Sequence, residues 1–528
     1  MHENNNKILN PVFLTLILCV AGFIIYSNTL AGSFQLDDHI VIIDNTAVKN
    51  ISNPGGIWKY WPTRFITNFS FAVNYQMGKL NVLYYHLFNL LIHIGSAILV
   101  WRLMLLTLIS PGMKGQGITN YREEIAFFAG LVFLTHPIQT QAVSYIVQRA
   151  TSMSGFFCIL SMYLYARAAL LDGKFYFGAL LAGIIAMFTK ESAVILPFTI
   201  MLYDFFFITE SQSSRWKRIA PFLFTLFIIP ATMFFTRSID FANMCRVQEG
   251  SPGIAPANYL MTQFGVIVEY MKLLIVPVSQ NVDHDYRVAL SFTQPQVFMP
   301  MTALIFVLII GVKTFSKYKL ISFGIFWFFI TLLPESSVIP IADVMFEHRL
   351  YLPMLGYSVF LAGLIYYALE RTGIKTVKTV MMCLVIIYCA MTYSRNFVWQ
   401  SEVSLWDDAV RKSPAKSRVY NNRGYAYLEK DRFDLAIKDF DKAIALEPDI
   451  EAGYYYNRGN VYNYTDKPDA AIADYSKAIE MNPYYGFAYI GRAFAYFKKK
   501  DFDKSKADVA RAKSLGYETD AISAALGQ

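Results

Sequence analysis

Long apolar segments recur between residues 11 and 394, and they constrain the fold more than any other feature of the chain. The first, 11–30, has no charged residue, and 20 helical residues rise about 30 Å, the thickness of a bilayer core. Only 16% of the 528 residues are charged, against roughly 25% in soluble proteins. We therefore predict an all-α polytopic membrane protein, not a soluble globule or a disordered chain.

Eleven segments are predicted to span the membrane. They are 11–30, 83–108, 125–141, 152–171, 174–189, 192–208, 219–236, 298–312, 320–333, 353–369 and 378–394. The first could be a signal peptide, but its apolar run is longer than such peptides use. A twelfth stretch, 261–279, carries Glu269 and Lys272. Because a charge at mid-bilayer costs roughly 2.5–3.5 kcal/mol, we expect this stretch to be re-entrant or interfacial.

The basic residues predict the orientation. With the N-terminus in the cytoplasm, eleven spans place the basic loops near 114–122, 215–218, 313–319 and 371–378 on the cytoplasmic side, as the positive-inside rule requires. Residues 395–528 are then extracytoplasmic. The formal net charge of +8 is explained by this topology, without a nucleic-acid partner. Four of the five cysteines lie in apolar runs, so we predict no disulfide framework and no metal cluster.

A period of 34–35 residues marks the C-terminal region. The recurring positions are Gly424, Tyr427, Ala436, Phe440, Ala443 and Pro448, then Gly459, Tyr462, Ala471, Tyr475, Ala478 and Pro483. A third copy is degraded, with Tyr517 where proline is expected. This order resembles tetratricopeptide repeats, which form stacked helix pairs that bind extended peptides. We predict a membrane domain at 1–394, with an outer loop at 31–82, and a repeat domain at 395–528 with repeats at 417–450, 452–485 and 486–519.

The same topology places several ionisable residues on the outer side, where such groups mark a site by default. Asp37 and Asp38 follow the first span, and adjacent carboxylates suit a general base or a divalent metal ligand. Arg149, Lys190, His348 and Arg349 are cations that could hold a phosphate. Further candidates for the donor or acceptor pocket are His39, Arg64, His86, His136, Glu191, Asp283, Asp285 and Glu347.

Structural explanations stand beside these predictions. Glu191 next to Lys190, and Glu347 near Arg349, could form ion pairs, and His136 with the following proline could simply break a helix. The chain has no glycine-rich phosphate loop, no zinc-protease motif and no nucleophile elbow. A nucleoside triphosphatase or a protease is therefore not expected.

Several stretches resemble one family, the membrane-embedded O-mannosyltransferases with C-terminal tetratricopeptide repeats. They are 37–38, Arg64, 74–75, 85–93, 136–143, Arg149 and 190–191, together with 258–263 and 347–353, which are most similar to bacterial relatives. The resemblance implies a glycosyltransferase-C fold, a polyprenyl-phosphate sugar donor and an acidic catalytic residue in the first outer loop. Gln148 departs from the eukaryotic pattern, which leaves the sugar and the acceptor open.

The predicted mechanism is an inverting hexosyl transfer. Asp37 or Asp38 takes the proton of an acceptor hydroxyl, while Arg149, Lys190 and Arg349 hold the lipid phosphate as it leaves. A divalent cation (Mg or Mn) bound by Asp37, Asp38 and Asp283 is left open.

The resemblance favours a polypeptide acceptor recruited by the repeats, in a bacterial inner membrane with the site facing the periplasm. The alternatives are transfer to an envelope lipid or polysaccharide, and a non-catalytic membrane scaffold that binds a partner protein. A transporter is disfavoured because no inverted repeat is visible.

Overall fold

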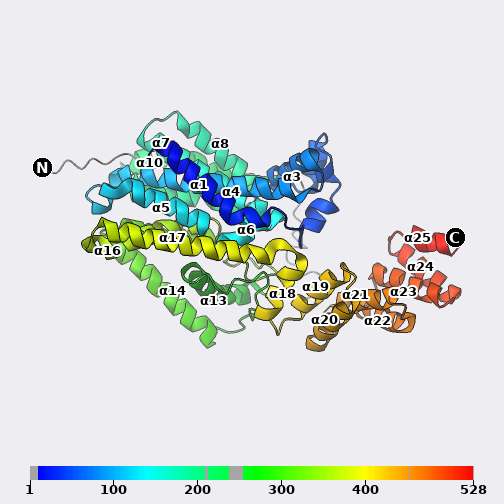
Figure 1. Ribbon diagram of the computed structural model, residues 1–528. Helices are drawn as coiled ribbons and strands as arrows, with labels where there is room; N and C mark the ends of the chain where they lie inside the picture. Colours follow the sequence, from blue (N-terminus) through cyan, green and yellow to red (C-terminus); the bar gives the residue numbers. More distant parts are fainter. Residues whose placement is uncertain (1–9, 209–211, 237–253, 450, 527–528) are drawn as a thin grey trace. The chain divides into compact units, whose positions relative to one another are not determined.

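The computed structural model describes residues 10–208, 212–236, 254–449 and 451–526, and this part of the chain is all-helical, without a strand (Figure 1). It divides into two compact units. The first contains the apolar helices. The second contains 283–285 and everything from Glu402 onward, so the division falls at 401 and 402, a little after the predicted boundary at 394.

The first unit is a bundle of long and short helices. Its α-helices are α1 (Pro11–Tyr26), α2 (Pro54–Tyr60), α3 (Phe65–Gly78), α4 (Val82–Ile109), α5 (Arg122–Thr135), α6 (Thr140–Ser144), α7 (Arg149–Leu170), α8 (Phe175–Met187), α9 (Leu196–Phe207), α10 (Gln212–Leu223), α11 (Ile228–Phe235), α13 (Pro256–Ile275), α14 (Pro295–Thr314), α15 (Lys319–Leu332), α16 (Pro353–Leu369) and α17 (Ile374–Asn396). Its short helical turns include η2 (His39–Ile43), η4 (Pro62–Arg64), η7 (Pro137–Gln139), η8 (Ile146–Gln148), η9 (Glu191–Ile195) and η11 (Glu347–Leu350).

Every predicted span coincides with helical structure. Within the described part of the chain, seven helical stretches are long and apolar enough to cross a membrane: Pro11–Thr29, Val82–Ile109, Ile146–Leu170, Ser214–Phe235, Pro295–Thr314, Pro353–Thr372 and Ile374–Gln400. Phe175–Met187 and Lys319–Leu332 are shorter apolar helices. The chain is therefore a multi-pass membrane protein, and the count of eleven spans stays a prediction.

The span predicted at 125–141 is interrupted. Helix α5 ends at Thr135, and His136 adopts an extended backbone before Pro137. A proline disfavours the helical conformation in the residue that precedes it and lacks the N–H that would continue the helix. The expectation that this His-Pro pair breaks a helix is confirmed.

Helix α13 corresponds to the charged stretch at 261–279. Near its start, the Tyr259 hydroxyl donates to the carbonyl of Glu335, at 2.7 Å. Near its end, His136 Nε2 donates to the carbonyl of Leu274, at 2.9 Å. Glu335 and His136 follow α15 and α5, two helices predicted to run in the same direction through the membrane. Contact with the same ends of both helices supports an interfacial α13.

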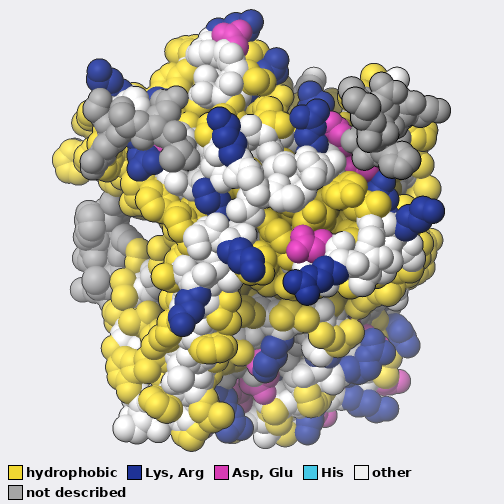
Figure 2. Space-filling model, turned by 90° about the vertical axis from the view of Figure 1, so that its left-hand side faces the viewer, with side chains coloured by type: hydrophobic (Ala, Val, Ile, Leu, Met, Phe, Trp, Pro, Cys, Tyr) yellow, Lys and Arg dark blue, Asp and Glu magenta, His cyan; other side chains and the backbone are white. Residues whose placement is uncertain are grey.

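Basic side chains gather on one face of the molecule. Figure 2 shows this face, with Lys and Arg side chains spread between apolar ones. Many residues of the predicted cytoplasmic loops are exposed, among them Lys114, Lys217, Lys317 and Lys375. The positive-inside rule predicts that these loops are cytoplasmic, and the orientation of the chain in the membrane stays a prediction.

The second unit is a stack of helix pairs. Its helices are α18 (Glu402–Lys412), α19 (Ser417–Leu428), α20 (Phe433–Leu446), α21 (Ala452–Tyr464), α22 (Pro468–Met481), α23 (Gly486–Lys498), α24 (Phe502–Ser514) and α25 (Asp520–Ala525). Each predicted repeat is one pair. The recurrence of glycine at positions 424 and 459 has a physical reason, because a Cβ at Gly424 or Gly459 would lie 2.9 Å from a ring carbon of Phe440 or Tyr475, respectively.

One arginine in each repeat joins neighbouring helices. Arg423 binds Asp439 with two hydrogen bonds, Arg458 binds Asp474 and Arg492 binds Asp508 in the same way, at 2.7–2.8 Å. Each arginine also contacts the helix that precedes its repeat. Arg423, for example, donates to Asp407 of α18. The third copy, degraded in sequence, keeps this bridge.

Candidate active site

A cavity of about 440 Å³ lies in the first unit and collects ionisable side chains from distant segments. Its charged and titratable lining residues are Asp37, Arg64, Lys190, Glu335, His348 and Arg349. The remaining lining is largely apolar or aromatic: Ile40, Val41, Tyr60, Trp61, Val147, Gln148, Ala150, Ile341 and Phe346. The six charged and titratable residues come from the loop after α1, from η4, from the turns that follow α8 and α15, and from η11.

The two adjacent aspartates have different surroundings. Asp37 is exposed and lines the cavity. Asp38 is 1% exposed, and its carboxylate accepts hydrogen bonds from the backbone N–H groups of Gln35 and Val147 at 2.9 and 2.7 Å. Burial raises the pKa of Asp38 to about 8, although both N–H groups oppose the rise. Of this pair, Asp37 lines the cavity and Asp38 does not.

Three cations surround the other side of the cavity. Lys190 Nζ lies 2.6 Å from Oε1 of Glu335 and donates to the Thr151 hydroxyl at 3.0 Å. Arg349 is fixed by backbone carbonyls, including that of Asp343 at 2.7 Å. The third cation, Arg64, donates to both carboxylate oxygens of Glu191.

The cations set the protonation of their neighbours. Burial, and then Lys190 and Arg349, lower the pKa of His348 well below its usual value, so the ring is neutral. Its Nδ1 atom is buried and, among the residues that the structure describes, has no hydrogen-bond partner. Burial raises the pKa of Glu335, but Lys190 and Arg349 outweigh burial and hold it below the usual value. The cavity thus contains an ionised carboxylate, fixed cations and a neutral imidazole.

Arg149 does not line the cavity, although its neighbours Gln148 and Ala150 do. Its guanidinium is fully buried. It donates to Asn89 Oδ1 at 2.7 Å, to Ser70 Oγ at 3.1 Å and to the carbonyl of Tyr85 at 3.0 Å. All three acceptors are neutral, so Arg149 holds α3, α4 and α7 together.

Other predicted residues are likewise placed outside the cavity lining. His86 bonds the carbonyl of Gly32, and His136 bonds that of Leu274. Glu347 is buried and accepts from the N–H of Asn281. The exposed side chain of His39 follows the aspartate pair, and Glu191 pairs with Arg64 rather than with its neighbour Lys190.

Asp283 and Asp285 belong to the second unit, where Asp283 pairs with Lys416 and Arg418 and Asp285 is exposed. Among the residues that the structure describes, no group of three His, Cys, Asp or Glu side chains is placed to hold a metal ion. Asp37 and Asp38 belong to the first unit and Asp283 to the second, and we derive no metal-dependent step.

Glu335 was missed in the sequence analysis. It follows directly on a predicted span at its outer end, so the rule that singled out Lys190 and Arg349 applies to it equally. What the sequence did not show is that Lys190 would pair with this carboxylate and not with Glu191.

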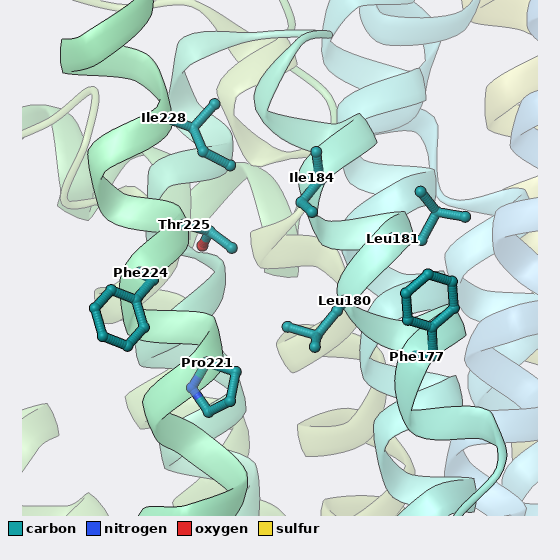
Figure 3. A pocket seen from close by; sticks show the side chains of 8 residues that line it. All are labelled: Phe177, Leu180, Leu181, Ile184, Pro221, Phe224, Thr225 and Ile228. Carbon is teal, nitrogen blue, oxygen red and sulfur yellow. The ribbon is translucent and has the colours of Figure 1, made fainter.

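An apolar groove of about 340 Å³ lies between α8 and the helices α10 and α11. Figure 3 shows Phe177, Leu180, Leu181 and Ile184 of α8 on one side, and Pro221, Phe224, Thr225 and Ile228 on the other. Several of these side chains are exposed, including Phe177 and Phe224.

Comparison with known proteins identifies the repeats and a group of similar proteins. The tetratricopeptide-repeat model matches residues 417–450 and 452–485. A protein O-mannosyl-transferase of Caenorhabditis elegans is 24% identical over 83% of this chain and 63% of its own length. The protein O-mannosyl-transferase TMTC3 of Homo sapiens is 23% identical over 80% of this chain and 50% of its own. The resemblance to these transferases is confirmed.

The similarity covers both parts of the chain, and not the repeats alone. The chain nevertheless spans only about half to three fifths of the length of the curated relatives it matches. Among solved structures, the first tetratricopeptide-repeat domain of Spaghetti aligns with 21% of this chain and 97% of its own at 27% identity, with a TM-score of 0.20.

Proposed function

We propose that this protein is an inverting glycosyltransferase that moves a sugar from a polyprenyl phosphate to a hydroxyl group of an acceptor polypeptide. The relatives' names indicate mannose as the sugar. The observation that carries the proposal is the single cavity in which the exposed carboxylate of Asp37 lies with the cations Arg64, Lys190 and Arg349. A base and a set of phosphate-binding cations are the two requirements of this reaction.

Each part of the cavity has a role in the proposed step. The acceptor oxygen attacks the anomeric carbon, and Asp37 takes the hydroxyl proton. The bond between the anomeric carbon and the phosphate oxygen breaks, and the electron pair leaves with the phosphate. Lys190 and Arg349 stabilise the charge that develops there. A phosphate is a stable leaving group, so the reaction needs no general acid.

The apolar groove fits the tail of the lipid donor. Ile184, at one end of the groove, lies in the last turn of α8, which ends at Met187, three residues before Lys190. On the other side of the groove, α11 packs against η4, which carries Arg64. An isoprenoid chain in the groove would therefore extend towards two of the cations that bind its phosphate.

The proposal extends to the setting of the reaction. The predicted topology puts the cavity and the repeats on the outer side, which in a bacterial inner membrane is the periplasmic side. The repeats are a protein-interaction module, so we assign the recruitment of the acceptor polypeptide to them. The membrane unit would then be an example of the glycosyltransferase-C fold.

A transfer assay tests the proposal. The full chain in detergent is given polyprenyl-phosphate [³H]mannose and an unfolded acceptor polypeptide, and labelled polypeptide is measured. Asp37→Asn should lower the rate by about 10²–10⁴, the usual contribution of a general base. Asp44→Asn, an exposed residue of the same loop, should not change the rate.

Two outcomes contradict the proposal. Full activity of Asp37→Asn would exclude Asp37 as the base. Transfer to an envelope polysaccharide but not to polypeptide would exclude the protein acceptor and leave the transferase.

A further inference from the structure

Lys190 needs an anion beside it whether or not a substrate is bound. The residue is 8% exposed, and an ammonium group without a counterion is costly at such a buried position. The carboxylate of Glu335 supplies this counterion at 2.6 Å. If a substrate phosphate binds Lys190, as the proposed function requires, two anions compete for one cation.

The two glutamates at the cavity are held very differently. Three hydrogen bonds from Arg64 and one from the Thr63 hydroxyl hold Glu191. Among the residues that the structure describes, Lys190 is the one hydrogen-bonding partner of the Glu335 carboxylate. Glu191 is therefore fixed, whereas the backbone of Glu335 is held by its carbonyl and its carboxylate is held only by Lys190 among the described contacts.

The backbone around Glu335 allows the side chain to move. Helix α15 ends at Leu332 and η11 begins at Glu347, and the residues between them form turns and bends without a helix. The Glu335 side chain is 17% exposed and faces the cavity. A change of rotamer would carry the carboxylate away from Lys190 without breaking a helix.

The charges of the cavity lead to the same conclusion. The cations Arg64, Lys190 and Arg349 are matched by the carboxylates of Asp37 and Glu335 in the lining and of Glu191 beside it. Asp37 does not pair with a cation in any described contact and Glu191 is fixed, so Glu335 is the carboxylate whose departure makes room for a phosphate.

We propose that Glu335 occupies the place of the donor phosphate in the ligand-free protein, that the phosphate displaces it from Lys190, and that its return helps to expel the polyprenyl phosphate product. This inference rests on the proposed function. It makes Glu335 a positioning residue that sets the affinity of the cavity for phosphate, and not a catalytic one.

Binding of isoprenoid phosphate tests the inference by the sign of the change. Farnesyl phosphate and, separately, inorganic phosphate are titrated into the full chain in phosphatidylcholine nanodiscs at pH 7, and Kd is measured by calorimetry. Removing a competing unit charge a few ångströms away should tighten binding by at least about tenfold. Glu335→Gln is therefore expected to bind farnesyl phosphate about tenfold more tightly than the wild type, and a purely structural ion pair would give equal or weaker binding.

Controls separate the possible causes. Glu124→Gln removes another carboxylate paired with a lysine, Lys378 at 2.8 Å, that does not line the cavity, and should leave Kd unchanged. In a Lys190→Gln background, Glu335→Gln should no longer tighten binding, because the shared cation is gone. Glu335→Asp keeps the charge on a shorter side chain and should give an intermediate Kd, which covers the case in which Glu335→Gln does not fold.

The results also distinguish this inference from the proposed function. If the wild type binds farnesyl phosphate and Glu335→Gln binds it no better, only the role of Glu335 is overturned. If neither protein binds it at millimolar concentration, the phosphate site itself is overturned. Tighter binding of inorganic phosphate as well would show that the headgroup alone displaces Glu335.

Discussion

The backbone N–H of Val147 donates a hydrogen bond of 2.7 Å to Oδ1 of Asp38. This bond joins the first outer loop to η8, and a second bond from Gln35 closes the loop on itself. Asp38 therefore fixes the backbone from which Asp37 faces the cavity. Asp38 therefore has a structural role, and Asp37, as we propose, has the chemical one.

Replacing Asp38 should therefore affect stability first. Asp38→Asn keeps one acceptor oxygen, so one of the two buried N–H groups loses its acceptor, which costs about 1–3 kcal/mol. We expect a lower midpoint of thermal unfolding in detergent and partial loss of transfer, against an unchanged midpoint for Asp44→Asn. If Asp38→Asn instead unfolds at the wild-type midpoint but loses as much activity as is expected for Asp37→Asn, Asp38 is the base.

Arg149 should behave as a structural residue. Arg149→Lys keeps the charge but cannot reach Asn89, Ser70 and Tyr85 together, and each hydrogen bond to a charged group contributes about 1.5–3 kcal/mol. Thermal unfolding should shift down accordingly, while the folded fraction binds farnesyl phosphate with the wild-type Kd. A weaker Kd at unchanged stability would return Arg149 to the phosphate site predicted from the sequence.

The groove between α8 and α11 should discriminate donors by chain length. Leu181→Trp fills part of the groove, and the loss of contact with two CH₂ groups at about 0.8 kcal/mol each should raise KM about tenfold for a long polyprenyl donor. KM for a farnesyl-phosphate donor should change little. Phe198→Trp, exposed on α9 outside the groove, is the matched control. Equal effects on both donors would exclude the groove as the tail site.

Asp283 should stabilise the second unit in a pH-dependent way. Burial raises the pKa of Asp283, but Arg418 and Lys416 outweigh it and hold the pKa below the usual value. The carboxylate therefore contributes stability above pH 4 and loses it as the pH falls through its folded-state pKa. At pH 7, Asp283→Asn should lower the free energy of unfolding by about 1 kcal/mol relative to the wild type.

Tryptophan fluorescence during thermal unfolding measures this difference, which should shrink as the pH is lowered from 5 to 3. The exposed neighbour gives the control, since Asp285→Asn should match the wild type at every pH. A difference that persists unchanged at pH 3 would show that charge pairing is not its cause.

The sequence determined the helices and the repeats, because hydropathy over about 20 residues and a 34-residue period are local properties that one chain segment carries by itself. The break at His136 could be predicted in this way too, since a proline acts on the residue that precedes it, whereas the interfacial placement of α13 stays a prediction. The contacts of each ionisable side chain could not be predicted from such local properties.

Only the tertiary structure decided which charges meet. Arg149 and Arg349 both stand just before predicted spans, and Asp37 and Asp38 are adjacent, yet Asp37 and Arg349 line the cavity whereas Asp38 and Arg149 do not. The pairing of Lys190 with Glu335 joins segments far apart in the chain. Such contacts depend on the rotation and packing of whole helices, which a local pattern of residue types does not determine.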